Sequence, residues 1–297
     1  MSAASIAVTL DAVVLAVTDG VPRVLLVDDG TAPALPSGPL DVDQDLTLER
    51  GLRRYVREQT DLELGYVEQL YTFGDRDRAP DAEQVRRLSV GYLALVLQTP
   101  PTAGVRWADV HELLPWEDMR QGPPPAHETL RERLLDWAED DDARAQRLSL
   151  TFGPPWDGIR ALERYELLYG VGLVAEHALD QGLTPTDELP GTPLRADHRR
   201  ILATALGRIR GKLTYRPVVF ELLSEPFTLL ELQRTVEALA GVDLHKQNFR
   251  RQVIASGLVE GTGDTRQAGS GRPAQLFRYR PEVQLERPRP GLGQPYR

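Results

Sequence analysis

The sequence predicts an α/β sandwich domain followed by a C-terminal winged helix-turn-helix domain. In the first 140 residues, strand patterns lie before and after one helical pattern, and a second helical pattern closes the segment. In residues 215–281, three short helical patterns precede two strand patterns that flank a Gly-rich loop. A chain of 297 residues is also long enough for two domains, each with its own core.

We expect four segments along the chain. They are the sandwich at 1–140, connecting helices at 141–195, the winged helix-turn-helix domain at 196–284 and a flexible tail at 285–297. The second segment holds no motif that we could assign.

The N-terminal domain begins with two strand patterns that are joined at Asp19-Gly20. The predicted elements are strands at 6–17 and 22–27, a loop at 35–38, a helix at 46–59, strands at 65–73 and 88–97, and a helix at 126–139. The run at 88–97 is almost continuously apolar, which is typical of a strand that is covered on both faces. We therefore expect this strand at the centre of the sheet.

The first two helices of the C-terminal domain are predicted from apolar spacing and from capping residues. Pro217 suits the first position of a helix whose apolar stripe includes Val218 and Leu222. Thr228 and Glu231 have the spacing of a capping box for the second helix. Gly241 is the expected C-cap of that helix, and Asp243 is the expected N-cap of the third.

The third helical pattern carries hydrogen-bond donors that suit phosphates and base edges. Phe249, Val253 and Ile254 would anchor this helix to the domain. The predicted DNA-binding residues are Lys246, Gln247, Asn248, Arg250 and Arg251 on the helix, with Arg266 and Arg272 in the wing. The sequence therefore favours a domain that binds double-stranded DNA, and the alternative is a small helical domain that binds protein.

The distribution of charge supports DNA binding at one end of the chain. From Arg195 onward there are 18 Lys and Arg against 10 Asp and Glu, whereas the whole chain has a net charge of −9.

The absence of cysteine excludes disulfides, thiolate zinc sites and a Cys nucleophile. The five histidines show no ligand spacing, so no metal site is predicted. No apolar run has membrane-spanning length and no signal-peptide pattern is present, so we expect a cytoplasmic protein without a membrane partner.

The segment LPSGPLDVDQDLTLERGLRRYVREQTDLEL at 35–64 resembles a degenerate Nudix box. Arg54 matches the Arg of that box, Val56 its aliphatic position and Glu58 one of its glutamates. Tyr55 and Gln59 stand where the box has Glu, and Asp61 replaces its Gly. The spacing from Gly38 to Arg54 is two residues longer than the box allows. The resemblance implies a Nudix-like sandwich.

These replacements bear on catalysis, because Nudix hydrolysis depends on divalent cations that carboxylates hold. The remaining acids, Glu49 and Glu58, are too far apart for neighbouring ligands. We expect Glu58 to be solvated or paired with Arg, no catalytic residue, and no hydrolase activity. The alternative is an active pyrophosphohydrolase with an accessory DNA-binding module.

The whole chain resembles the Nudix-related transcriptional regulators of NAD metabolism, the NrtR type and its NadQ-like branch. The resemblance is carried by YVEQLYTFGDRDR at 66–78, by the helices at 215–241 and 244–253, and by GSGRPAQLFRY at 269–279. It implies a homodimeric, ligand-responsive repressor of genes for NAD biosynthesis or salvage. The implied effector is ADP-ribose, NAD or ATP, and no cofactor is required.

A nucleotide pocket can be proposed from the same domain. Guanidinium groups grip a diphosphate, and aromatic faces stack on adenine. The predicted ligand-binding residues are Arg53, Arg54, Arg57, Glu58, Tyr71, Phe73, Arg76, Arg78, Arg86 and Arg87. Tyr71 and Tyr92 are expected in the core more than in the pocket.

Overall fold

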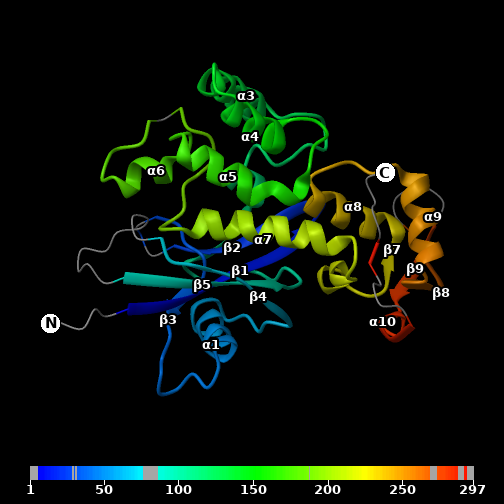
Figure 1. Ribbon diagram of the computed structural model, residues 1–297. Helices are drawn as coiled ribbons and strands as arrows, with labels where there is room; N and C mark the ends of the chain where they lie inside the picture. The colour runs from blue at the N-terminus through cyan, green and yellow to red at the C-terminus, as the bar shows by residue number, and fades with distance from the viewer. Residues whose placement is uncertain are drawn as a thin grey trace.

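The computed structural model describes residues 6–28, 30, 32–75, 86–186, 188–267, 273–286 and 291–292. Its N-terminal part is a six-stranded mixed sheet with helices on both faces (Figure 1). The strands of this sheet are β1 (Ile6–Thr18), β2 (Val21–Val27), β3 (Ser37–Pro39), β4 (Tyr66–Phe73), β5 (Arg86–Leu95) and β6 (Val105–Asp109). The strand order is β4-β5-β1-β2-β6, and β3 pairs with β1.

Pairing within the sheet is antiparallel except between β1 and β5, which run parallel from Ile6↔Arg86 to Leu15↔Leu95. The apolar strand β5 lies inside the sheet as predicted, although β1 takes the central place. Strand β6 was not predicted, because its five residues, VRWAD, show no clear alternation.

The helices divide between the two faces of the sheet. They are α1 (Leu48–Thr60), α2 (Val110–Leu113), α3 (Pro125–Ala138), α4 (Asp142–Phe152), α5 (Ala161–Gly170), α6 (Ala175–Asp180) and α7 (His198–Leu213). Helix α1 packs on one face, where Leu52 and Val56 meet Leu10 and Val14 of β1. Helix α7 lies along the other face, below α5 in Figure 1. The 141–195 segment contains α4, α5 and α6 and a short 3-10 helix at Gly158–Arg160.

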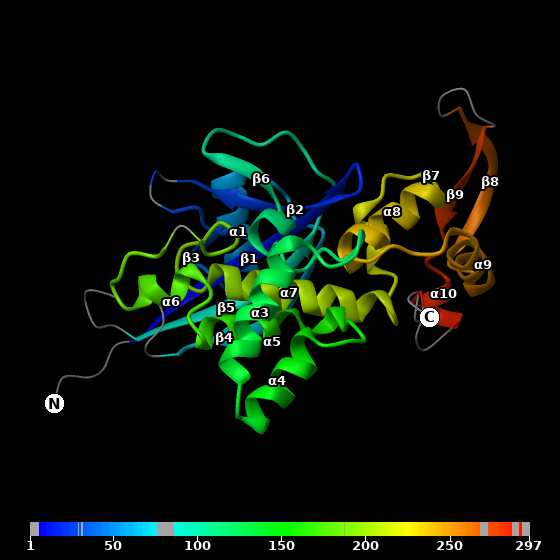
Figure 2. The same cartoon turned by 90° about the horizontal axis from the view of Figure 1, so that it is seen from above.

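The C-terminal domain is a winged helix-turn-helix. It comprises a 3-10 turn at Val218–Leu222, β7 (Phe227–Thr228), α8 (Leu229–Ala240), α9 (Lys246–Ser256), β8 (Val259–Arg266), β9 (Ala274–Tyr279) and α10 (Val283–Glu286). The order of its three-stranded sheet is β7-β9-β8. In the view from above, α9 and the β8–β9 wing lie at the end of the molecule away from the N-terminus (Figure 2).

The capping box of α8 is confirmed. The Thr228 side chain accepts from the Glu231 N–H at 3.2 Å, the Glu231 side chain accepts from the Thr228 N–H at 2.6 Å, and Gly241 is the C-cap. Two other boundary predictions were wrong. An α-helix was predicted from Pro217, but the structure has only a five-residue 3-10 turn there. Helix α9 starts after His245, and Asp243 does not cap it.

A continuous core joins the sandwich to the winged helix domain. A single cluster of buried apolar residues extends from Val13 of β1 through Leu202 of α7 to Leu239 of α8 and Phe277 of β9. Within the segment predicted as a flexible tail, Leu292 is buried. Its N–H donates to the Leu213 carbonyl at 3.0 Å, and its carbonyl accepts from the Gln252 side chain on α9 at 2.6 Å. No helix in the described ranges is long and apolar enough to cross a membrane.

Candidate functional sites

Helix α9 exposes all five of its predicted DNA-binding residues. Phe249 and Val253 are buried and fix the helix to the domain. The exposed residues are Lys246, Gln247, Asn248, Arg250 and Arg251. Asn248 and Arg251 contact each other, because the Arg251 guanidinium donates to Asn248 Oδ1 at 3.3 Å. The helix therefore presents cations and amides together on a solvent-facing surface.

The turn before α9 is held by side chains of α8. Gln233 Nε2 donates to the Leu244 carbonyl at 3.0 Å and to Glu237 Oε1 at 2.8 Å. The same Glu237 oxygen accepts from the Leu244 N–H at 3.0 Å. This network holds the Leu244 backbone in the turn just before α9.

A groove of about 850 Å³ lies between α8, α9 and the wing strands. Lys246 and Arg250 line it from α9, and Gly263 and Gln275 line it from β8 and β9. The groove therefore places the two α9 cations beside the wing strands.

Arg266 is exposed but engaged within the domain. Its guanidinium donates to Glu231 Oε1 at 2.8 Å and to the Pro226 carbonyl at 2.6 Å. Glu231 is also the capping-box residue of α8, so Arg266 braces the wing against the start of that helix. Arg272 lies outside the described residues.

Two of the three arginines predicted on α1 are paired within the sandwich, and the third, Arg57, is exposed. Arg53 donates to Glu49 at 2.9 Å and to the Gly65 carbonyl at 3.0 Å. Arg54 forms a bidentate pair with Asp45 and lies 3.5 Å from Glu58. The hydrogen bonds from Arg54 lower the pKa of the Asp45 carboxyl. The expected pairing of Glu58 with Arg is confirmed.

The two residues that replace box glutamates connect α1 to the loop before it. The Tyr55 ring lies against Gly38 so closely that a Cβ on Gly38 would fall 2.3 Å from Tyr55 Cε1. Gln59 Nε2 donates to the Ser37 carbonyl at 2.7 Å, and the Ser37 N–H donates to Gln59 Oε1 at 3.1 Å. These residues do not fit the Nudix metal ions, because an aromatic ring and an amide occupy the junction where carboxylates would be needed.

A cavity of about 350 Å³ lies on the α7 side of the sheet. Its lining is Thr9, Asp11, Ser37, Gly38, Pro39, Phe73, Gly74, Asp75, Arg87, Ser89, Arg195, Ala196, Asp197 and His198. The site therefore combines strands β1, β3 and β5, the end of β4 and the start of α7. Arg87 and Arg195 give it cationic groups that suit phosphate.

Asp11 and His198 form the fixed wall of this cavity. Both are buried, and His198 Nε2 lies 3.2 Å from Asp11 Oδ1. The other imidazole nitrogen, Nδ1, accepts from the Leu35 N–H at 2.9 Å. Because Nδ1 is an acceptor, the proton lies on Nε2 and is donated to Asp11. Ser89 and Thr9 also donate to Asp11 Oδ2, so α7 is tied to β1, β5 and the loop.

The predicted ligand-binding residues do not gather into one pocket. Phe73 and Arg87 line the cavity, whereas Arg53, Arg54, Arg57 and Glu58 lie on α1. Arg86 donates to the Gly74 carbonyl at 2.8 Å. Tyr71 is 62% exposed, so its predicted core position was wrong, while Tyr92 is buried as expected. Arg76 and Arg78 lie outside the described residues.

Most residues of the cavity could not be predicted from the sequence. The one available signal was Asp11, an acid in the otherwise apolar run LDAVVLAV. Arg195 and His198 carried no signal, since they follow a segment without an assigned motif.

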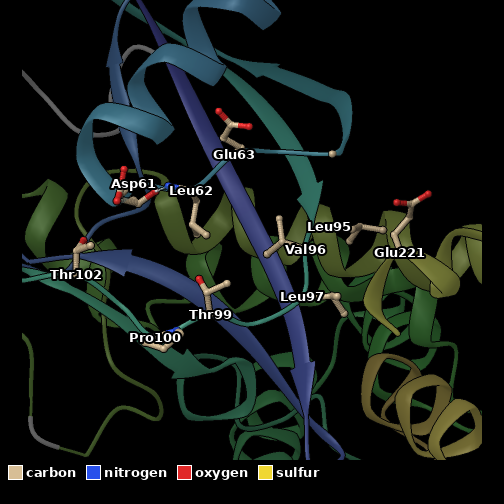
Figure 3. Close-up of a pocket in the computed structure, with 12 residues that line it drawn as sticks. Asp61, Leu62, Glu63, Leu95, Val96, Leu97, Thr99, Pro100, Thr102 and Glu221 are labelled. Carbon is tan, nitrogen blue, oxygen red and sulfur yellow. Dashed lines mark hydrogen bonds between the residues drawn. The ribbon is translucent and has the colours of Figure 1, made fainter. Parts of the chain in front are cut away.

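A second cavity of about 590 Å³ lies where α1 and β5 end (Figure 3). Asp61, Glu63 and Glu221 contribute carboxylates to its lining, and Leu95 and Val96 contribute apolar side chains. No Lys or Arg is among the described residues that line it. A nucleotide diphosphate would meet only negative charge there, so this cavity does not suit one.

A buried ion triad connects the sandwich, the connecting helices and the winged helix domain. Arg164 of α5 binds both Glu117 carboxylate oxygens, at 2.7 and 2.9 Å, and Arg210 of α7 binds the same carboxylate. Arg210 Nε also donates to the Leu239 carbonyl of α8 at 3.0 Å. Burial would raise the pKa of Glu117, but the two guanidinium groups outweigh it and hold the pKa below its usual value. The triad therefore fixes the end of α8 to α7.

A family profile described as "NrtR DNA-binding winged helix domain" matches residues 219–279. Over 276 residues the chain is 26% identical to the "ADPR responsive transcriptional repressor NtrR" of Acinetobacter baylyi, and the alignment covers 91% of this chain and 81% of that protein.

Two solved structures of Shewanella oneidensis NrtR have the same overall fold. The complex with a 27mer DNA has a TM-score of 0.58 at 24% identity and covers 94% of this chain and 95% of its own. The second NrtR structure has a TM-score of 0.56 at 25% identity, with 93% and 95% covered. The likeness therefore extends over nearly the whole chain, from the sandwich to the winged helix domain.

Proposed function

We propose, from the place of this chain among the NrtR-type Nudix regulators, that it is a transcriptional repressor that binds operator DNA and responds to an adenine nucleotide. The observation that carries this proposal is the solvent-facing set of donors on α9, beside the wing of an NrtR-type winged helix. By the same resemblance, the regulated genes are those of NAD biosynthesis or salvage.

The proposed effector is ADP-ribose, with NAD and ATP as alternatives that share its adenine and phosphate groups. The Acinetobacter relative is described as ADPR responsive. The cavity beside Arg87 and Arg195 is the proposed binding site, since it combines two guanidinium groups with the ring of Phe73. A cavity of this volume is at the lower end of the range for small-molecule sites, about 300–1,000 Å³.

We further propose that the protein acts without hydrolysing its effector. Tyr55 and Gln59 support this proposal, because they fill the junction where an active Nudix site needs carboxylates.

The active form is proposed to be a homodimer on a palindromic site. One winged helix makes a modest interface with DNA, and two-fold symmetry doubles it, with half-sites about one helical turn or a multiple apart. Light scattering with and without DNA tests this proposal, and a monomer at micromolar concentration under both conditions would contradict it.

Selection from a pool of random duplexes tests the DNA-binding function and does not require a known operator. The expected product is a two-fold symmetric consensus that the protein binds more tightly than a scrambled duplex of the same composition. A matched variant in which Asn248, Arg250 and Arg251 are all replaced by Ala should recover no consensus. Recovery of the same consensus by that variant would show that α9 does not read the DNA.

A further inference from the structure

Arg200 lies behind the cavity at the start of α7 and is surrounded by carboxylates from three elements. Its guanidinium contacts Asp75 after β4, Glu166 of α5, and Asp197 at 3.3 Å. The guanidinium carbon also lies 5.1 Å from the centre of the Phe73 ring. Asp75, Asp197 and Phe73 all line the cavity. Arg200 therefore contacts residues that form the wall of the cavity.

Arg200 is nearly buried among carboxylates. One guanidinium is shared by three carboxylates, and the Arg200 side chain is only 15% exposed. Burial would lower the pKa of Arg200, but Asp197 and Glu166 outweigh it and raise the pKa, so the group stays charged. A phosphate in the cavity would therefore compete with the carboxylates for a cation that is always present.

We propose that Arg200 binds the phosphate of an anionic nucleotide in this cavity. When it does so, Arg200 leaves Glu166, and this change makes the winged helix domain respond to the bound nucleotide. This inference rests on the proposed function and adds a ligand-binding residue on α7, beyond the sandwich. The ligand class is a nucleotide with a diphosphate, because two further arginines, Arg87 and Arg195, line the same cavity.

Helix α5 and the buried triad connect Glu166 to the end of α8. Glu166 lies on α5, where Arg164 holds the Glu117 carboxylate. Glu117 in turn holds Arg210, which donates to the Leu239 carbonyl of α8. Loss of the Arg200–Glu166 contact frees α5 to shift against α7, and the buried triad transmits that shift to the end of α8. Packed helices with two arrangements are a general means of such coupling.

Three variants separate ligand binding from transmission. Arg200→Met removes the proposed phosphate contact. Glu166→Gln weakens the competing contact and leaves the cavity lining intact. Arg208→Met is the matched control, since Arg208 lies on the same helix and pairs with Glu68 at 3.2 Å outside this network.

The measurements are calorimetry with ADP-ribose in the absence of DNA, and affinity for the selected duplex with and without ADP-ribose. Arg200→Met should lose about 10- to 100-fold in ADP-ribose affinity, as expected for a hydrogen bond between charged groups. Glu166→Gln should bind ADP-ribose at least as tightly as the wild type. Allosteric couplings are typically about 5- to 150-fold, and in Glu166→Gln the effect of ADP-ribose on DNA affinity should fall towards none. Arg208→Met should match the wild type in both measurements.

Two outcomes would overturn this inference and leave the proposed function standing. One is unchanged ADP-ribose affinity in Arg200→Met, and the other is a DNA affinity that responds fully to ADP-ribose in Glu166→Gln. A wild-type protein whose DNA affinity does not respond to ADP-ribose, NAD or ATP contradicts the proposed function as well. Should Arg200→Met fail to fold, Asp75→Asn gives the test, because it removes an exposed competing carboxylate. ADP-ribose affinity should then rise at least about twofold, and an unchanged or weaker affinity would overturn the inference.

Discussion

Gln59 and Ser37 form a closed pair of hydrogen bonds, in which the amide of Gln59 bonds both the N–H and the carbonyl of Ser37. Gln59 stands where the Nudix box has a glutamate. A carboxylate at this position would accept a hydrogen bond from the Ser37 N–H, but it would have no donor for the Ser37 carbonyl. At this position the chain thus has a structural link between α1 and β3, where the Nudix box has an acid.

Loss of this link should lower stability. Gln59→Ala leaves two backbone groups of Ser37 without their partner, and we expect it to lower the free energy of unfolding by about 1–2 kcal/mol. Glu58→Ala is the matched control, because Glu58 is exposed and should change stability by about 0.5 kcal/mol or less. Urea unfolding of both variants measures the difference, and equal midpoints would contradict a structural role for Gln59.

The closed junction also predicts that the protein does not hydrolyse ADP-ribose. With Mg²⁺ or Mn²⁺ present, phosphatase-coupled release of phosphate should stay at background, in the wild type and in Glu58→Gln alike. Metal-dependent turnover that Glu58→Gln abolishes would show a working Nudix site and favour the alternative of an active pyrophosphohydrolase.

Two substitutions on α9 should separate base contacts from phosphate contacts. Asn248→Ala should weaken binding to the selected duplex by about 1–3 kcal/mol and change binding to a scrambled duplex less. Lys246→Ala should weaken both and lower the salt dependence, because a phosphate contact carries no sequence information. Fluorescence anisotropy at two salt concentrations distinguishes these results. Equal losses on both duplexes for Asn248→Ala would exclude base recognition by that residue.

Burial of His111 predicts a loss of stability in mild acid. Burial is the main cause that lowers the pKa of His111 from 6.5 to about 4, although Asp118 lies 3.4 Å from its ring. Between these values the unfolded chain binds a proton that the folded protein does not. The contribution of neutral His111 to the free energy of unfolding is therefore complete above pH 6.5. It decreases as the pH falls towards 4, by on the order of 3 kcal/mol. Urea midpoints at pH 7 and pH 5 should differ less in His111→Gln than in the wild type or in the exposed control His245→Gln.

The winged helix could be predicted in large part because its signals are local. The capping box of Thr228 and Glu231, the C-cap Gly241 and the donors of α9 all lie within a few residues of the elements they define. The true start of α9 could not be found in this way. The turn before α9 is held by Gln233 and Glu237, which belong to the preceding helix.

Helix α7 was not predicted as an element, and the reason lies in its arginines. Arg199 and Arg210 are buried, so charged residues interrupt the apolar stripe that would have identified the inner face of the helix. Their partners, Glu176 and Glu117, lie 23 and 93 residues away. The cavity had the same difficulty, because Asp11 and His198 meet only after the chain has folded.

The most direct test of the central claim is the affinity of the wild-type protein for its selected duplex, measured by anisotropy with and without ADP-ribose. The account predicts that ADP-ribose weakens this binding at least about fivefold, within the usual range of allosteric coupling, and weakens binding to a scrambled duplex less. By reciprocity, the duplex must weaken ADP-ribose binding by the same factor in calorimetry. DNA affinity that is unchanged by saturating ADP-ribose, NAD and ATP would contradict the account.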